Sequence, residues 1–436
     1  MPVIWKLGSA TDAGIQHRLR RTEMTAATST LTKYLTVLLP VVVACSENEV
    51  SVAAANVRDS AGITIVENPL PQTAPTFVLS GPILEIGEVS GAEEYELDNV
   101  AAIAPLSDGS VAVATGGTEI RWYDADGRFR QRAGGAGGGP GEFQSIRYMR
   151  RLAGDSLLVY DGRHRRVTRF ASDGSYVRDD AVRQDGEAPP MVSAALVDGS
   201  LLTRTTVEMP PASTPLYRAQ QAFAVQRGDS TQPLRQYPGP ETALHVDGSG
   251  GDIRSIFIFR LPFGRAAYAS SGSDRFFIGS SDSYDVDVWN AAGQLVRIIR
   301  VDVPIRPVTD ELLSAYVEGE IERRRQMADQ GSLTFNEAES RQQLRDLRHA
   351  PAVPAYSSIL GTGDGGLWVN EFKMPGAEST AQRWTVFDVE GRVVGTIDLP
   401  DRFTPMHVDE DVLWGVSLDA LDVPYVHAYT FGVPAG

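Results

Sequence analysis

The sequence predicts an all-β fold in which six four-stranded blades surround a central channel, that is, a six-bladed β-propeller. Two observations carry this prediction. Hairpin turns recur at a regular spacing, such as the 47 residues that separate Gly127 from Gly174, and an apolar strand precedes or follows each turn. This spacing lies within the range of propeller repeats. Strands near both ends of the chain lack strong partners nearby, which favours a ring that the two ends close together.

The stretch Glu119–Phe143 is the clearest repeat. Residues 120–123 alternate before the turn Asp124–Gly127, and a second strand begins at Arg128. An Asp-Gly pair between alternating strands favours a tight hairpin, because glycine tolerates the positive φ that the turn needs. The glycines of 134–139 are interpreted as a flexible link between blades, since neither a lysine nor a helix follows them, as a phosphate-binding loop would require.

Two sets of turns punctuate the body of the chain. The first set lies before apolar strands and comprises Ser107–Ser110, Gly154–Ser156, Asp198–Ser200, Gly272–Asp274, Gly363–Gly366 and Asp409–Asp411. The second set follows aromatic or apolar strands and comprises Tyr123–Gly127, Phe170–Gly174, Val225–Asp229, Trp289–Gly293 and Phe387–Gly391. Six turns of the first kind and five of the second predict six blades with one outer turn missing.

Both ends of the chain are expected to close the ring, and the propeller is assigned to residues 58–432. The turn Asp59–Gly62 would supply the missing outer turn. The strand after it, Ile63–Val66, is then predicted to pair beside the last strand, Tyr425–Phe431. Such closure removes the exposed edges that an open sheet would carry.

Two stretches depart from the repeat. Residues 206–257 are marked by prolines and weakly periodic, so we expect extended loops on blade three. Residues 309–350 predict a helical hairpin inserted after blade four. Its first helix has Thr309 as a plausible N-cap with acidic residues after it, and its second helix is predicted at about Phe335–Arg348 with Thr334 as the candidate cap. The charged run Glu318–Arg325 is interpreted as a solvated helix face.

The N-terminal region has the pattern of an export signal. Lys33 precedes an apolar run, residues 34–44, that is too short to span a membrane and ends at Cys45, the only cysteine of the chain. Residues 42–45 resemble the bacterial lipobox. We therefore predict a signal peptide over 1–44, with 1–23 lying upstream if Met24 is the true start. Cys45 is the predicted site of lipid attachment, and residues 45–57 form a tether.

The charge of the chain excludes one class of partner. The net charge is −16 and the sequence pI is about 4.9, whereas non-specific nucleic-acid binding needs a basic surface. We therefore expect no nucleic-acid partner and interpret the acidity as an aid to solubility. We expect a monomer.

Several stretches carry a resemblance to known repeats. Residues 137–143, 155–161, 165–170 and 173–174 resemble the NHL repeat. Over residues 58–432 the chain is similar to bacterial six-bladed β-propeller lipoproteins, NHL-like or TolB-like, and Asp59–Asn68 and Trp384–Gly395 match their pattern. Thr115–Thr118 departs from it, because the family pattern has Ala-Asp there. The resemblance implies a lipid-anchored protein of the cell envelope. Ser46 after the cysteine favours the outer membrane, facing the periplasm or the cell surface.

The residues expected to face a ligand lie near the points where the inner strands enter the channel. These candidates are Asn99, Arg147, Tyr148, Arg260, Tyr356 and His407. Arg147 and Arg260 could make charge-assisted contacts with an anionic ligand, bidentate to a carboxylate or phosphate. The alternative, that both arginines pair with acidic neighbours between blades, stays open.

The sequence contains no clear catalytic constellation. Gly154–Leu157 matches a hydrolase signature, but it opens a strand rather than a helix and is interpreted as a turn. No metal or cofactor is predicted, although a channel-bound divalent cation such as calcium stays open, with Asn99, Glu142 and Asn370 as conceivable ligands. The first hypothesis is therefore a lipid-anchored binding module for an envelope protein, peptide or glycan. The alternative is a metal-assisted lactonase or lyase with its site at the channel mouth.

Overall fold

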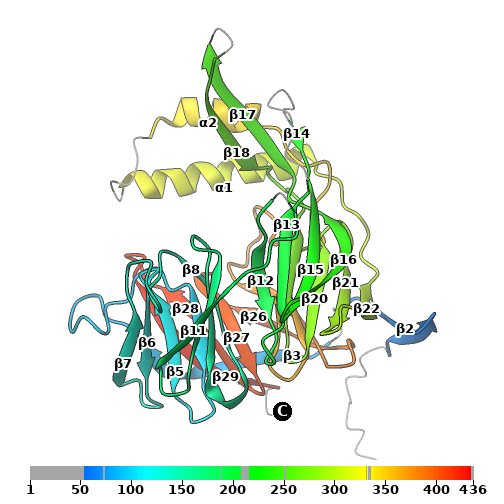
Figure 1. Ribbon diagram of the computed structural model, residues 1–436. Coiled ribbons are helices and arrows are strands. Elements are labelled where there is room, and N and C mark those ends of the chain that lie inside the picture. Colours follow the sequence, from blue (N-terminus) through cyan, green and yellow to red (C-terminus); the bar gives the residue numbers. More distant parts are fainter. Residues whose placement is uncertain are drawn as a thin grey trace, which may run out of the picture. The chain divides into compact units, whose positions relative to one another are not determined.

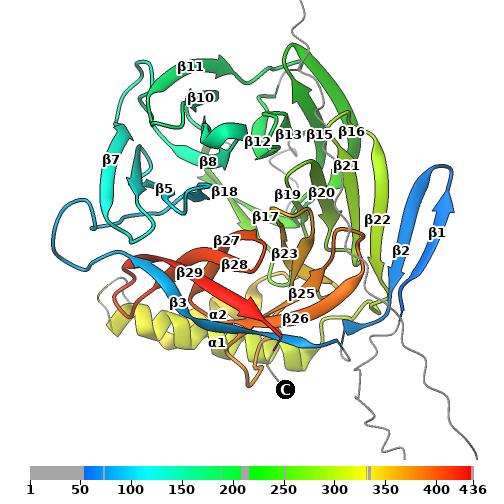
Figure 2. The ribbon, with the colours of Figure 1, turned by 90° about the horizontal axis from the view of Figure 1, so that it is seen from below.

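The computed structural model describes residues 54–71, 74–186, 188–207, 216–249, 252–329, 331 and 335–433. The predicted signal peptide, Cys45 and Thr334 lie outside the described residues. Within them, six four-stranded antiparallel units follow one another along the chain. Figure 2 shows these units arranged around a central axis, with the innermost strand of each facing the centre. The fold is a β-propeller, as predicted.

The first three blades follow one another along the chain from β4 to β16. Blade one contains β4 (Ala102–Pro105), β5 (Val111–Thr115), β6 (Glu119–Tyr123) and β7 (Phe129–Gly134). Blade two contains β8 (Ile146–Arg151), β9 (Leu157–Asp161), β10 (Arg166–Phe170) and β11 (Tyr176–Ala181). Blade three contains β12 (Met191–Ala195), β13 (Leu201–Thr206), β15 (Gln220–Arg227) and β16 (Ser230–Pro238).

The remaining three blades complete the ring. Blade four contains β19 (Ala267–Ser271), β20 (Arg275–Ser280), β21 (Asp285–Asn290) and β22 (Leu295–Val301). Blade five contains β23 (Tyr356–Gly361), β24 (Leu367–Glu371), β25 (Gln382–Phe387) and β26 (Val393–Leu399). Blade six contains β27 (Phe403–Asp409), β28 (Val412–Leu418), β29 (Pro424–Gly432) and, from the other end of the chain, β3 (Thr76–Ile86).

The blades adhere through apolar side chains on both faces of their sheets. The second strands contain apolar runs, such as Val111–Ala114 in β5 and Leu157–Tyr160 in β9, and every residue of these two strands is buried. Each pair of neighbouring blades encloses its own apolar cluster; between blades six and one, for example, Trp414 and Tyr123 belong to the same cluster. The core is therefore a ring of interfaces rather than one central mass.

Closure of the ring differs from the prediction in the strand that is used. β3 pairs antiparallel with β29, with Ile86 opposite Val426. The predicted strand instead belongs to β2 (Ile63–Asn68), which pairs parallel with β22 at the outer edge of blade four. The prediction was wrong because Gly81 and Pro82 weaken the strand signal of β3, although an outer strand tolerates proline.

The turn Asp59–Gly62 also serves a different purpose from the predicted one. It joins β1 (Asn56–Ser60) to β2, so it extends blade four rather than completing blade six. Asn68 at the end of β2 fixes this extension to blade five: its Nδ2 donates to the carbonyl oxygen of Gly391, and its Oδ1 accepts from the backbone N–H of Val393, both at 2.9 Å. Strand structure therefore begins at Asn56, within the segment predicted as a tether.

Two insertions lie on the same side of the propeller, at the top of Figure 1. The helical insertion after blade four comprises α1 (Asp310–Asp329) and α2 (Glu337–Asp346). The other insertion, between blades three and four, is the hairpin of β17 (Thr242–Ser249) and β18 (Asp252–Arg260), which pairs with β14 (Leu216–Tyr217). The helical hairpin confirms its prediction. Asn336 caps α2, because its Oδ1 accepts from the backbone N–H of Glu339 at 3.2 Å.

Phe263 connects the insertions to the propeller. Its ring lies 5.8 Å from that of Tyr316 in α1 and 6.0 Å from that of Phe372 after β24.

No helix among the described residues is long and apolar enough to cross a membrane.

Candidate functional site

Two hollows lie along the inner strands of the propeller. The first, which we name the arginine pocket, has a volume of about 470 Å³. It is lined by Arg147, Arg163, Arg204, Arg260 and Tyr268 together with small and apolar residues. It lies where the inner strands of blades two, three and four begin. The second, which we name the channel cavity, has a volume of about 340 Å³ and is lined by residues from the inner strands of all six blades, toward their ends.

Four different elements supply the arginines of the arginine pocket. Arg147 lies at the start of β8, Arg163 in the turn between β9 and β10, Arg204 in β13, and Arg260 at the end of β18. Glycine at 162 makes room for Arg147, because a Cβ there would lie 2.7 Å from the Cγ of that arginine. The inserted hairpin therefore completes a pocket that blades two and three begin.

The arginine pocket contains no acidic side chain in its lining. None of its four arginines forms an ion pair with a described residue. Arg204 is half-buried, and burial, followed by the charge of Arg260, lowers the pKa of its guanidinium. The pocket thus gathers positive charges that no carboxylate of the described chain compensates.

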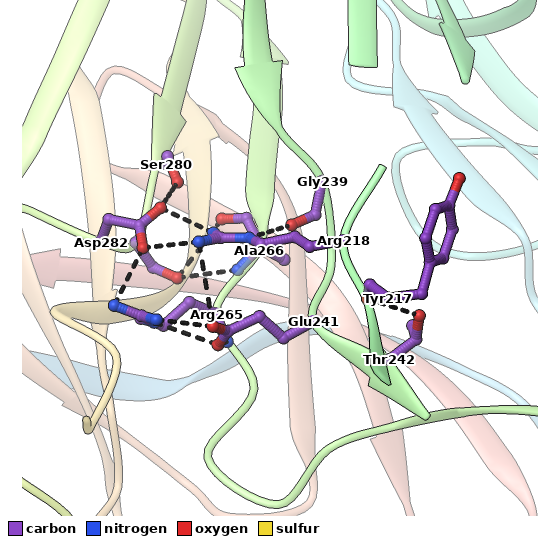
Figure 3. A network of polar contacts seen from close by, with 10 residues as sticks. Tyr217, Arg218, Gly239, Glu241, Thr242, Arg265, Ala266, Ser280 and Asp282 are labelled. Carbon is purple, nitrogen blue, oxygen red and sulfur yellow. Dashed lines mark hydrogen bonds and ion pairs between the residues drawn. The ribbon is translucent and has the colours of Figure 1, made fainter. Parts of the chain in front are cut away.

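Two arginines outside the pocket lining, Arg218 and Arg265, do form ion pairs with carboxylates (Figure 3). Arg218 pairs with Asp282 at 2.6 Å, and Arg265 pairs with Glu241 at 2.5 Å and with Asp282 at 3.1 Å. Arg218 also donates to the carbonyl oxygen of Gly239 at 2.9 Å. We name Arg218, Glu241, Arg265 and Asp282 the anchor network; its charges cancel, and it fixes the base of the β17–β18 hairpin to blade four.

Tyr268 provides the aromatic wall of the arginine pocket. Burial raises the pKa of its hydroxyl, and the nearby Arg260 opposes that rise. Its ring lies 5.8 Å from that of Tyr356, which in turn lies 5.5 Å from the ring of Tyr284. Tyr356 is fully buried, so it supports the pocket from behind and does not face a ligand.

The channel cavity holds two further candidates, Tyr148 and His407. The hydroxyl of Tyr148 accepts from the backbone N–H of Ala195 at 3.0 Å, which joins blade two to blade three. Burial, followed by the charges of Arg150 and Arg151, lowers the pKa of His407 to about 3. His407 is therefore neutral at physiological pH.

The structure thus divides the six candidates. Arg147 and Arg260 come together in the arginine pocket, and Tyr148 and His407 in the channel cavity. Tyr356 lies in the core, and Asn99 is exposed in the connection between β3 and β4 with a φ of 43°. The alternative of ion pairing between blades finds no acidic partner for Arg147 or Arg260 among the described residues.

Sequence reasoning missed Arg163 and Arg204. The sequence could have indicated Arg204, because this charged residue interrupts Leu201–Thr206, a segment that the preceding turn predicts to be a strand. Nothing in the sequence indicated Arg163, since an arginine in a turn is ordinarily solvated. Their proximity to Arg260 follows from the inserted hairpin, which no local pattern reveals.

The conceivable metal ligands lie apart from both hollows. Glu142 accepts from the backbone N–H of Gly139 at 2.8 Å and so shapes the glycine-rich link, while Asn370 lies in β24 rather than on an inner strand. Within the described ranges, no group of three or more His, Cys, Asp or Glu side chains is placed to hold a metal ion.

Comparison with known proteins gives similarity in fold. No family model matches the chain, and no curated protein matches it. A putative exported protein from Bacteroides fragilis is similar at 11% identity over 85% of this chain and 100% of its own, with a TM-score of 0.44.

Two other solved structures are similar over comparable lengths. Virginiamycin B lyase from Staphylococcus aureus shares 10% identity over 81% of this chain and 99% of its own, with a TM-score of 0.37. The WD40 repeats of RRP9 share 11% identity over 82% of this chain and 99% of their own, with a TM-score of 0.35. Identities this low concern the fold alone.

Proposed function

We propose that this β-propeller is a binding module whose arginine pocket receives an anionic group of its partner. The observation that supports the proposal is the gathering of four arginines without an acidic side chain in the lining. Neighbouring guanidinium groups repel one another, and the partial burial of Arg204 adds a desolvation cost. A carboxylate or phosphate offsets both costs through charge-assisted, bidentate hydrogen bonds.

The partner in this proposal is a protein, peptide or glycan of the cell envelope that carries such groups. The propeller is held at the membrane by lipid on Cys45, in the outer membrane of a cell that has one. The pattern of residues 33–46 supports this location. Anchoring would place an overall acidic protein, of net charge −16, near its partner, so recognition would depend on the local positive pocket rather than on net charge.

Binding of two labelled probes by the full chain in detergent tests the proposal. The probes are a fluorescein-labelled oligoglutamate, which represents acidic peptides, and a labelled oligogalacturonate, which represents acidic glycans. We expect at least one to bind saturably, and the double variant Arg204→Ala, Arg260→Ala to weaken binding at least about tenfold, or about 1.4 kcal/mol.

Arg178→Ala is the matched control, because Arg178 lies on the outer strand β11 and pairs with Asp180 at 2.9 Å. It should leave binding unchanged. Failure of both probes to bind, or equal weakening by the control and the double variant, would refute the proposal.

A further inference from the structure

The channel cavity adjoins the arginine pocket and extends toward the other ends of the inner strands, and two arginines, Arg150 and Arg151, line it. The Nη2 of Arg150, in β8, donates to the carbonyl oxygen of Gly272 at 2.7 Å, which links blade two to blade four. Arg151 pairs with Asp409 of β27 at 3.5 Å, which links blade two to blade six. The cavity is therefore a defined space between blades.

Three residues that line this cavity carry a buried polar atom without a hydrogen-bond partner among the described residues. They are Arg150 through Nε, Ser193 through Oγ and His407 through Nε2. An unsatisfied buried polar group costs about 1–3 kcal/mol, so native proteins satisfy nearly all of them with protein, water or ligand. These three atoms come from blades two, three and six, and a water molecule or a polar ligand group bound between those blades would satisfy them.

The charges of the lining favour an anion. Arg151 is matched by Asp409 and by Asp155, the latter at 3.9 Å. Arg150 forms no ion pair with any described side chain, and His407 is neutral because its pKa lies near 3. One positive charge therefore remains unmatched beside a hydroxyl and an imidazole that can both donate.

The rest of the lining is mixed. Three serines, Ser270, Ser271 and Ser273, lie beside apolar residues that include Ile103, Met149, Leu360 and Met406. A volume of about 340 Å³ lies within the range of small-molecule sites, which combine apolar walls with a few convergent polar groups. An inorganic anion would leave the apolar walls facing water. A small molecule with one charged end and one apolar end matches both the unmatched charge of Arg150 and the apolar residues of the lining.

We propose that the channel cavity binds a small organic carboxylate, with its carboxylate against Arg150, Ser193 and His407 and its apolar chain against Met149 and Met406. This site is distinct from the arginine pocket, although Ser193 and Ala269 border both hollows. It does not depend on the partner proposed for that pocket.

Nuclear magnetic resonance of the full chain in detergent tests the inference. Histidines are labelled with ¹³C at Cε1, and the His407 signal is assigned by its loss in His407→Gln. Butyrate is the probe, and butyramide is its uncharged control of the same shape. We expect butyrate to shift the His407 signal saturably, with a dissociation constant of about 1 mM, and butyramide to leave it in place.

Arg150→Met should weaken the effect of butyrate at least about tenfold, whereas Arg204→Met and the outer-strand control Arg178→Met should not. If Arg150→Met does not fold, Ser193→Val tests the same site and should also weaken binding. The inference is overturned if butyrate causes no saturable shift, if butyramide acts equally, or if Arg204→Met removes the shift, since the cavity would then hold ordered water only or the anion would bind elsewhere.

Discussion

At the scale of single residues, Asp287 shows how this propeller tolerates a charge in its core. Burial raises the pKa of its carboxyl. The hydroxyl of Tyr237 donates to this carboxyl, and the Nε1–H of Trp289 donates to Tyr237 at 3.0 Å. Arg235 pairs with Asp287 at 2.5 Å from the solvent side. Blades three and four are therefore joined by a polar chain set within an apolar cluster.

The substitution Tyr237→Phe tests this arrangement. It removes one hydroxyl and leaves two buried groups, the carboxyl of Asp287 and the N–H of Trp289, each short of a partner. We expect a loss of about 2–4 kcal/mol in the free energy of unfolding, measured by urea denaturation. Tyr176→Phe is the control, because Tyr176 is exposed on β11; equal losses in the two variants would contradict this explanation.

At the scale of elements, the β17–β18 hairpin shows how an insertion is fixed to a ring. Burial opposes ionisation of Asp282, but the hydrogen bonds from Arg218 and Ser280 leave its pKa below the ordinary value. A carboxyl of this kind stabilises the fold at neutral pH, and its contribution is lost as the pH falls below about 3.8, its ordinary value. The anchor network therefore holds the hairpin, and Arg260 with it, throughout the physiological range.

The substitution Asp282→Asn should release the hairpin without unfolding the blades. It leaves Arg218 and Arg265 with an excess of positive charge, at a cost of about 1–3 kcal/mol for a partly buried pair. We expect faster amide hydrogen exchange in β17 and β18, while β5 and β9 stay protected. The exposed pair Arg383–Asp398 provides the control: Asp398→Asn should cost less than about 1 kcal/mol, and unchanged exchange in β17 and β18 of the Asp282 variant would contradict the anchoring role.

At the scale of the whole molecule, we expect the cooperative unfolding of the propeller to depend on β3, which closes the ring by pairing with β29. In this ring the last blade takes its outer strand from the other end of the chain, so that one blade joins both ends of the propeller. β3 does this in blade six, whereas β2 only extends blade four. The two strands lie close in sequence, but β3 closes the ring and β2 adds a strand to the outer edge of blade four.

Two deletions separate these roles. Removing residues 54–68 should preserve cooperative unfolding and lower Tm by a few degrees, on the order of 2–5 °C, because only an edge extension is lost. Removing residues 54–86 should abolish the cooperative transition, since β29 loses its outer neighbour β3 and the apolar cluster between blades six and one is exposed. Scanning calorimetry measures both, and cooperative unfolding of the longer deletion would show that β3 does not close the ring.

The local pattern determined most of the propeller. Each turn of the two predicted sets joins the strands expected of it, because Asp-Gly and related turns, together with alternating or fully apolar strands, report short-range preferences. The helical hairpin followed from Thr309 and the helical spacing of Val317 and Ile321, both of which are buried in α1. The turns and the helical hairpin depend on residues that are close in sequence, and such residues are also close in the folded structure.

Only the tertiary structure decided which strand closes the ring and which arginines meet. β2 is the stronger strand by composition, yet β3 pairs with β29, since blade six at the far end of the chain needs an outer strand at that position. Arg147 and Arg204 lie 57 residues apart and meet Arg260 only because the inserted hairpin returns to the channel mouth. Contacts of this range depend on the packing of whole blades, which no window of the sequence contains.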